Sequence, residues 1–169
     1  MRRTTGAGRP ASGAVRLTAS LGLLALLLGA CGQDRLIPSP AAPTSPRDAD
    51  AYAAELVELT NETRAAEGLE PLAESICARE AALGRAANLV GEEALVHAPL
   101  GPVIERCAPH ASAAENLVNS VAEPGDVVAA WLDSSGHRAN LLDPALTEIG
   151  IGCVPDGSGL LCSQIFLGP

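Results

Sequence analysis

The sequence contains no lysine and very few aromatic residues. One tryptophan, one tyrosine and one phenylalanine make up 2% of the 169 residues, so sugar rings and bases find no platform on which to stack. All eleven basic residues are arginines, and they form no cluster after residue 31. Because proteins that bind nucleic acid neutralise its phosphates with lysine and arginine, these absences argue against nucleic acid as a partner.

The N-terminal segment has the pattern of an export signal. Arginines at positions 2, 3, 9 and 16 precede an uncharged apolar stretch at 21–30. That stretch is shorter than the roughly 20 residues that cross a bilayer, so we expect a signal peptide at 1–30 and no permanent span. The sequence LGAC at 28–31 resembles the cleavage box of bacterial lipoproteins, in which Cys31 carries the lipid. Ordinary secretion by signal peptidase is the alternative.

The mature chain is expected to be strongly acidic and tethered. The leader holds four of the eleven arginines and none of the twenty acidic residues, so its removal leaves a formal charge of −13. Such a charge gives no general attraction to anionic lipid headgroups. Residues 31–50 contain prolines at 38, 40, 43 and 46, which prevent regular helix or sheet and favour an extended tether. The remaining residues, 51–169, suit one domain of unknown oligomeric state.

Four cysteines follow the tether, an even number that argues for two disulfides in an exported domain. The segment IGIGCVPDGSGLLCSQIF predicts two strands around a Pro-Asp-Gly-Ser-Gly turn, which would place Cys153 opposite Cys162. We therefore expect the bridges Cys153–Cys162 and Cys77–Cys107. Free thiols or a zinc site are the alternative, but the sequence has no CxxC pair to support one.

Hydrophobic spacing predicts three helices. The first covers 48–69, with Gly68 as its C-terminal cap and these apolar residues on one face: Tyr52, Leu56, Leu59 and Ala66. The second covers 74–90, with its predicted core face at Ile76, Leu83, Ala86 and Val90. The third opens at Pro124, places Val127, Ala130 and Trp131 on one face and stops at 134–136. Ser135 is then expected to cap a short turn over 137–142.

Sheet-like alternation is confined to the last part of the domain. Strands are predicted within 147–154 and 160–166, and a third is expected to begin at Glu115. Helices combined with a small antiparallel sheet define an α+β domain.

Several motifs occur in a characteristic order: LVELTNETRAAEGLEPL, AENLV, AAWLDSSGHRANLLDPALTEIGIGC and a final SQIF. Over residues 53–167 this order resembles bacterial members of the CAP superfamily, the SCP-like extracellular proteins. Cysteine-rich secretory proteins, antigen 5 and plant pathogenesis-related proteins of group 1 belong to the same superfamily. The resemblance implies an α-β-α sandwich with a small antiparallel sheet between helices, and an extracytoplasmic location.

The resemblance also implies a cleft. Many members line it with two histidines and two acidic residues, and some bind a divalent metal there. His97 matches the first histidine and Glu115 the first acid, whereas the second acid falls on Ser134. The other histidine falls near Ala145, and this chain offers His137 instead, as other bacterial members do. Gln164 matches a polar position on the last strand that often faces the cleft in relatives.

Two neutral imidazoles, one carboxylate and a water would suit a zinc ion with an open position. His97, His137 and Glu115 are therefore the candidate ligands of a divalent metal. Each also has a simpler interpretation. His97 would bond nearby backbone, Glu115 would cap a neighbouring segment, and His137 would belong to a structural lock in which imidazole, guanidinium and amide satisfy the backbone.

The remaining singled-out residues are given structural roles. Trp131 is expected in the core, and His110 is expected at the surface. Structural hydrogen bonding is expected for Asn61, Arg64, Asn116, Arg138 and Asn140.

Two function classes follow from these residues. The first is a binding module held at the cell envelope that presents the cleft to a lipid, glycan or protein. The second is a metal-dependent or serine hydrolase acting on peptide or ester bonds. Ser134, Ser135, His137 and Asp133 supply the residue types of a serine hydrolase, but residues so close in sequence rarely align for catalysis. Neither a G-x-S-x-G nor an H-E-x-x-H motif occurs, so we favour the binding module over any hydrolase. A structural envelope protein with a vestigial cleft is a third possibility.

The lipid anchor gives the first testable prediction. Cys31→Ala is expected to release the protein from the membrane fraction or to block its processing, because several acyl chains anchor a protein firmly and none would remain. Intact mass of the membrane-fraction protein should show an acylated N-terminus at Cys31. A mature chain that is unlipidated and free in solution would contradict the anchor.

Overall fold

The computed structural model describes residues 48–169. The predicted signal peptide, Cys31 and nearly all of the tether lie outside these described residues. The described chain forms, in order, α1 (Ala49–Ala66), β1 (Ala73–Glu74), α2 (Ile76–Ala87), α3 (Gly101–Arg106), β2 (Ser112–Ser120), α4 (Pro124–Asp133), α5 (Ser135–Leu141), β3 (Glu148–Asp156) and β4 (Gly159–Gly168). No helix among residues 48–169 is both long enough and apolar enough to span a membrane.

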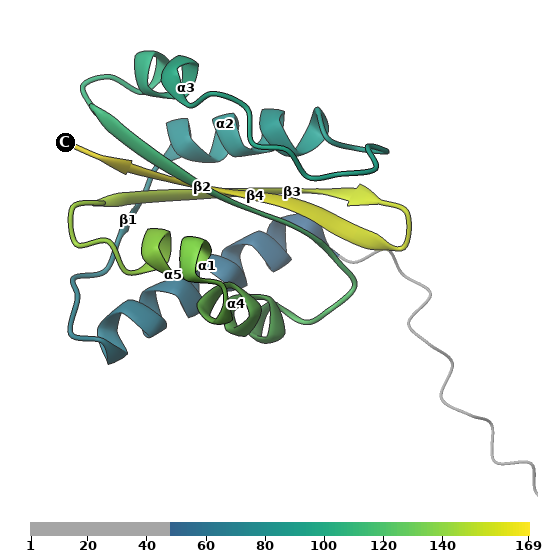
Figure 1. Cartoon of the computed structure of the whole chain (residues 1–169), viewed down its shortest axis with the longest axis horizontal. Helices are drawn as coiled ribbons and strands as arrows, with labels where there is room; N and C mark the ends of the chain where they lie inside the picture. The colour runs from purple at the N-terminus through teal and green to yellow at the C-terminus, as the bar shows by residue number, and fades with distance from the viewer. Residues whose placement is uncertain (1–47) are drawn as a thin grey trace, which may run out of the picture. The chain divides into compact units, whose positions relative to one another are not determined.

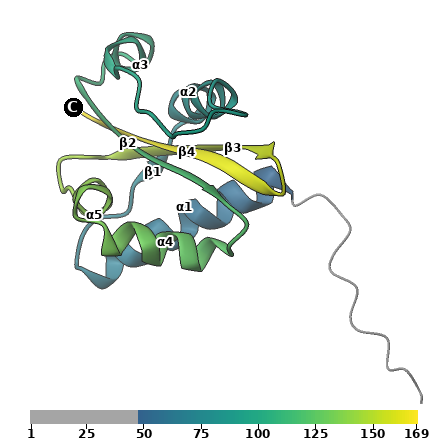
Figure 2. The same ribbon diagram turned by 45° about the vertical axis from the view of Figure 1, so that its right-hand side comes forward.

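The sheet lies between two layers of helices (Figures 1 and 2). Helices α2 and α3 cover one face, and α1, α4 and α5 cover the other. One hydrophobic cluster joins α1 and α4 to the sheet around Leu56, Trp131 and Phe166, which confirms the core position of Trp131. A second, smaller cluster joins α2 and α3 to the opposite face around Ala82 and Ile165. The predicted α+β class and α-β-α sandwich are thus confirmed.

The strand order is β1-β3-β4-β2, with β4 antiparallel to both of its neighbours. The sequence analysis predicted a purely antiparallel sheet, but the two-residue β1 pairs with β3 in parallel and is too short to show a pattern. Strand β2 begins three residues earlier than predicted, at Ser112, and forms one edge of the sheet. Because helices cover both faces, β4 is buried along almost its whole length.

Helix α2 packs on the sheet through alanines. Its buried residues are Ala78, Ala81, Ala82 and Ala86. The predicted core face was wrong at both ends, since Ile76 is 78% exposed and Val90 is 46% exposed. Two glycines of β3 complete the contact, because a Cβ at Gly150 would lie 2.1 Å from the backbone nitrogen of Arg79, and one at Gly152 would lie 2.3 Å from that of Leu83. Small residues on both sides therefore let the helix backbone approach the strand.

The other helix predictions hold with small shifts. Asp48 caps α1 by accepting hydrogen bonds from two backbone N–H groups, and Gly68 follows the helix with a φ of 75°, a left-handed conformation that glycine adopts freely. In α4 the buried residues are Pro124, Val127, Val128 and Trp131, and the predicted Ala130 is exposed. Ser134, not Ser135, is the N-cap of α5, and its side chain makes no capping hydrogen bond. Helix α3 was not predicted.

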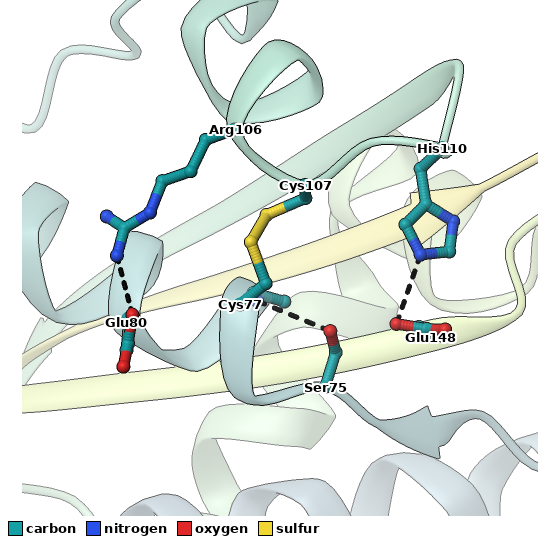
Figure 3. The surroundings of a disulfide bond; sticks show 8 residues. Ser75, Cys77, Glu80, Arg106, Cys107, His110 and Glu148 are labelled. Carbon is teal, nitrogen blue, oxygen red and sulfur yellow. Dashed lines mark hydrogen bonds and ion pairs between the residues drawn. A yellow bond between two sulfur atoms is a disulfide. The ribbon is translucent and has the colours of Figure 1, made fainter.

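Both predicted disulfides are confirmed. Cys77 in α2 bonds Cys107 directly after α3, so the bridge ties these two helices together (Figure 3). Cys153 and Cys162 bond across β3 and β4, where they are paired directly in the strand register. His110, which was expected at the surface, is partly buried: its side chain is 18% exposed, and its Nε2 lies 3.2 Å from a carboxylate oxygen of Glu148.

Arg64 joins the end of α1 to the segment between α5 and β3. Its buried guanidinium donates four hydrogen bonds to backbone carbonyls, at 2.9 Å to Glu70, 2.8 Å to Leu141, 3.0 Å to Asp143 and 3.4 Å to Leu146. Asn61, one turn earlier, exchanges two hydrogen bonds with the backbone of Leu72. The predicted structural roles of Arg64 and Asn61 are therefore confirmed.

Arg64→Met is expected to lower the free energy of unfolding by about 3–5 kcal/mol, because it leaves buried carbonyls without their charged donor. Urea denaturation of the purified chain measures the change. Arg79→Met is the matched control, since Arg79 pairs with Asp50 at the surface, and it should cost under about 1 kcal/mol. Equal costs for the two variants would contradict the role given to Arg64.

Candidate functional site

The structure brings His97, Glu115 and His137 to one hollow of about 490 Å³. His97 lies in the loop between α2 and α3, Glu115 on β2, and His137 on α5. The hollow lies where β2, at the edge of the sheet, passes between the two helical layers. The other lining residues are Leu100, Ala113, Ala114, Ser134, Gly136 and Asn140.

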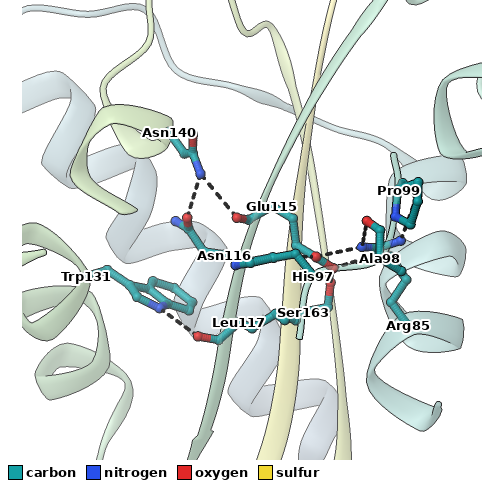
Figure 4. A network of polar contacts seen from close by, with 10 residues as sticks. All are labelled: Arg85, His97, Ala98, Pro99, Glu115, Asn116, Leu117, Trp131, Asn140 and Ser163. Carbon is teal, nitrogen blue, oxygen red and sulfur yellow. Dashed lines mark hydrogen bonds and ion pairs between the residues drawn. The ribbon is translucent and has the colours of Figure 1, made fainter. Parts of the chain in front are cut away.

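Glu115 is the most constrained residue of the site (Figure 4). Its carboxylate forms an ion pair with Arg85 of α2 through both oxygens, and the Nη2–Oε2 distance is 2.7 Å. Ser163 of β4 donates its hydroxyl to Oε1 at 2.8 Å, and Nδ1 of His97 lies 2.8 Å from Oε2. The carboxylate side chain is only 1% exposed, so its oxygens are held by the protein rather than by water.

Glu115 is ionised at neutral pH. Burial alone raises the pKa of this carboxyl, but hydrogen bonds from Arg85, His97 and Ser163 outweigh burial and hold the pKa below its ordinary value. An ionised carboxylate only accepts hydrogen bonds, so the proton between it and His97 lies on Nδ1. Nε2 of a neutral His97 is then an acceptor, on a side chain that is 52% exposed.

Arg85 was missed by the sequence analysis. Besides Glu115, its guanidinium donates to the backbone carbonyls of Ala98 at 2.8 Å and Pro99 at 3.4 Å. These residues directly follow His97, so Arg85 holds both the acid and the loop that carries the histidine. An arginine in the last turn of a helix is ordinarily explained by the helix dipole, and nothing in the sequence connects it to a strand 30 residues later.

His137 faces the hollow as a neutral imidazole. Burial lowers its pKa, and the neighbouring His97 lowers the pKa further. Among the described residues the imidazole has no hydrogen-bond partner, although the backbone carbonyl of His137 accepts from Asn116 at 3.4 Å. The lock interpretation was therefore wrong for the imidazole.

The lock around α5 consists of amides. Asn140 donates from Nδ2 to the backbone carbonyl of Glu115 at 3.1 Å and to the side chain of Asn116 at 2.9 Å. Arg138 takes no part in it, since its guanidinium instead contacts the Glu67 carboxylate at the surface. The structural roles predicted for Asn116 and Asn140 are confirmed.

Gln164 does not line the hollow, which corrects its prediction as a cleft residue. Its side chain is completely buried, accepts from Asn116 at 2.9 Å and donates to the Thr60 hydroxyl of α1 at 2.9 Å. Successive residues of β4 face opposite sides of the sheet, so Ser163 reaches the acid while Gln164 reaches α1.

The predicted divalent metal site does not fit this arrangement. Among residues 48–169 no group of three or more histidine, cysteine, aspartate or glutamate side chains is placed to hold a metal ion. Both oxygens of Glu115 are engaged, and its nearest neighbour is the positive charge of Arg85. A metal ligated by Glu115 would have to displace that arginine.

A serine hydrolase would need a hydroxyl bonded to its base. Ser134 shares the hollow with both histidines, but no serine hydroxyl of the described chain bonds an imidazole. Ser163 is completely buried and bonds Glu115 instead. Ser135 and Asp133 do not line the hollow.

Comparison with known proteins identifies the family. Residues 57–166 match the model of CAP, the cysteine-rich secretory protein family. The chain therefore belongs to this family. It is 31% identical over 131 residues to the uncharacterized protein YkwD of Bacillus subtilis strain 168, a match that covers 74% of this chain and 50% of the relative. The chain thus spans about half the length of that relative.

Solved structures share the fold. An extracellular protein containing an SCP domain from Bacillus anthracis str. Ames superposes with a TM-score of 0.64 at 22% identity, covering 78% of this chain and 45% of that one. An outer surface protein from Borrelia burgdorferi superposes with a TM-score of 0.60 at 19% identity, covering 72% of this chain and 94% of that one. At these identities the likeness extends to the fold alone.

Glu115→Gln is expected to lower the free energy of unfolding by about 3 kcal/mol at pH 7, because Arg85 loses its buried counter-charge. The pKa of Glu115 is depressed in the folded state, so its stabilisation is complete above the ordinary carboxyl value of 4.5 and is lost as pH falls through the folded value. The difference between wild type and variant should therefore shrink in urea titrations below pH 4.5.

Glu80→Gln is the control for this prediction, because Glu80 pairs with Arg106 at the surface and should change stability by under about 1 kcal/mol. A constant difference between wild type and Glu115→Gln from pH 7 to pH 3 would refute the ionised pair as the source of stability.

Proposed function

We propose that the chain is an exported binding module of the bacterial cell envelope. In this proposal a lipid at Cys31 anchors the chain, and residues 31–50 tether the domain. The hollow of His97, Glu115 and His137 then faces an envelope ligand. The leader with its LGAC sequence supports export, and two disulfides are typical of oxidising compartments. The extracellular SCP-domain protein of Bacillus anthracis has the same fold.

One observation carries the binding role: the acid of the site is fully engaged, while Nε2 of His97 and the imidazole of His137 have no hydrogen-bond partner among the described residues. Glu115 is held by Arg85, Ser163 and His97, so it serves to orient His97. His97 is half-exposed, and the imidazole of His137 has no partner among the described residues. Ring nitrogens of two histidines that face one hollow can hydrogen-bond a ligand. Such a preformed concave site with few convergent polar groups is typical of ligand binding.

The test follows the ring resonances of the three histidines by NMR while the purified, ¹³C-histidine-labelled chain is titrated at pH 7.5. The probes are phosphatidylglycerol vesicles, a chito-oligosaccharide and a mixture of random heptapeptides, one for each ligand class. We expect at least one probe to shift the resonances of both His97 and His137. His110 is an internal control, since it lies outside the hollow against Glu148.

The variant His137→Ala should weaken the response to that probe about tenfold, which corresponds to about 1.4 kcal/mol. If no probe moves His97 or His137, or if His110 moves as far as they do, the binding role is rejected.

A further inference from the structure

Strand β2 forms an edge of the sheet, and its free edge runs through the hollow. Among the strands of residues 48–169, only β4 pairs with β2. In an antiparallel pair, alternate residues direct both backbone N–H and C=O toward the neighbouring strand, and the residues between them direct both groups away. The carbonyl of Glu115 accepts from Asn140 at 3.1 Å, and that of Leu117 accepts from the Trp131 indole at 3.4 Å. Odd-numbered residues of β2 therefore direct their backbone polar groups away from β4.

Ala113 has the same orientation, two residues before Glu115. Its N–H and C=O, and the N–H of Glu115, have no hydrogen-bond partner within residues 48–169. Ala113 and Glu115 both line the hollow. Unpaired groups of this kind at a sheet edge form a template for another extended chain.

Two carbonyls further along the edge are occupied by the protein itself. Asn140 occupies the carbonyl of Glu115, and Trp131 occupies that of Leu117. The open groups that lie in the hollow run from the N–H of Glu115 back to Ala113.

The two histidines flank this open edge. His97 belongs to the loop on the α2 side of the sheet, and His137 belongs to α5 on the opposite side. Side chains of an extended chain point alternately to the two faces of a sheet. One side chain of an added strand would therefore meet His97 and Leu100, and the next would meet His137 and Ser134.

We propose that the hollow binds an extended polypeptide segment, which joins the sheet as a short additional strand beside Ala113–Glu115. This inference rests on the proposed binding function and names its ligand class. The open groups are two donors, the N–H groups of Ala113 and Glu115, and one acceptor, the C=O of Ala113. Their spacing along the strand matches the hydrogen-bonding groups of another peptide backbone. An acyl chain would bury these groups without hydrogen-bond partners, which costs about 1–3 kcal/mol of binding free energy for each group. A glycan finds no aromatic stacking platform in a chain that is 2% aromatic.

The experiment selects heptapeptides from a random phage-displayed library on the purified chain and measures the affinity of one selected peptide. Ala113→Pro removes the outward N–H but none of the hydrogen bonds to β4, and proline is tolerated at such edge positions. We expect it to weaken binding at least about tenfold. Asn119→Pro is the matched control, since Asn119 has the same orientation on β2 but lies outside the hollow, and it should bind as wild type does.

A second measurement uses only the wild-type chain and therefore holds even if Ala113→Pro does not fold. Each backbone nitrogen of the selected peptide is methylated in turn. Strand addition predicts loss of affinity at alternate positions, because only every second N–H of the peptide faces β2. A uniform or patternless loss overturns the proposal, as does unchanged affinity of a folded Ala113→Pro variant or a selection that enriches no peptide.

These results separate the two proposals. If vesicles or the oligosaccharide shift the resonances of His97 and His137 while heptapeptides do not, the binding function stands and the polypeptide ligand is wrong. If no probe shifts them, both proposals fail.

Discussion

Helix α2 lies so close to β3 that only glycine fits at Gly150 and Gly152, and the candidate site depends on this approach. The alanine face of α2 fixes the helix at backbone distance from the sheet, which brings Arg85 within reach of Glu115 on β2. Arg85 then holds the loop carbonyls that follow His97. A larger side chain at either glycine would push α2 outward and separate the guanidinium from the carboxylate. The packing of one helix therefore positions the acid and one histidine together.

The site differs in kind from the metal centre that its residue types suggested. A carboxylate beside two histidines resembles a ligand set only when the surrounding charges are left out. Once Arg85 is included, the negative charge of Glu115 is already balanced, and the acid acts on His97 by fixing its Nδ1 proton. The groups of the site that have no partner in the described chain are the Nε2 atom of His97, the imidazole of His137 and the outward backbone of Ala113 on β2.

The sequence predicted what depends on local pattern. Helix α1 with its Gly68 terminus, the hairpin that pairs Cys153 with Cys162, and the positions of His97, Glu115 and His137 all follow from spacing or from family motifs. The sequence analysis failed where contacts between distant segments determine which side of a helix or strand is buried. The core face of α2 consists of small residues that a search for large apolar ones overlooks. Gln164 faces α1 because successive residues of β4 point to opposite faces of the sheet. Arg85 has no local signal, since its partners belong to β2 and to a distant loop.

Some outward backbone groups of the edge strand β2 are bonded by the protein, and others are open. An edge strand left open along its length invites aggregation, and proteins commonly cover or interrupt it. Here Asn140 and Trp131 cover consecutive outward carbonyls, and each reaches across from a helix on the same side of the sheet. That protection stops at the hollow, where Ala113 is flanked by a half-exposed His97 and by His137 without a side-chain partner in the described chain. The open groups of Ala113 thus lie between the two histidines, and these are the groups to which the proposed extended chain would bond.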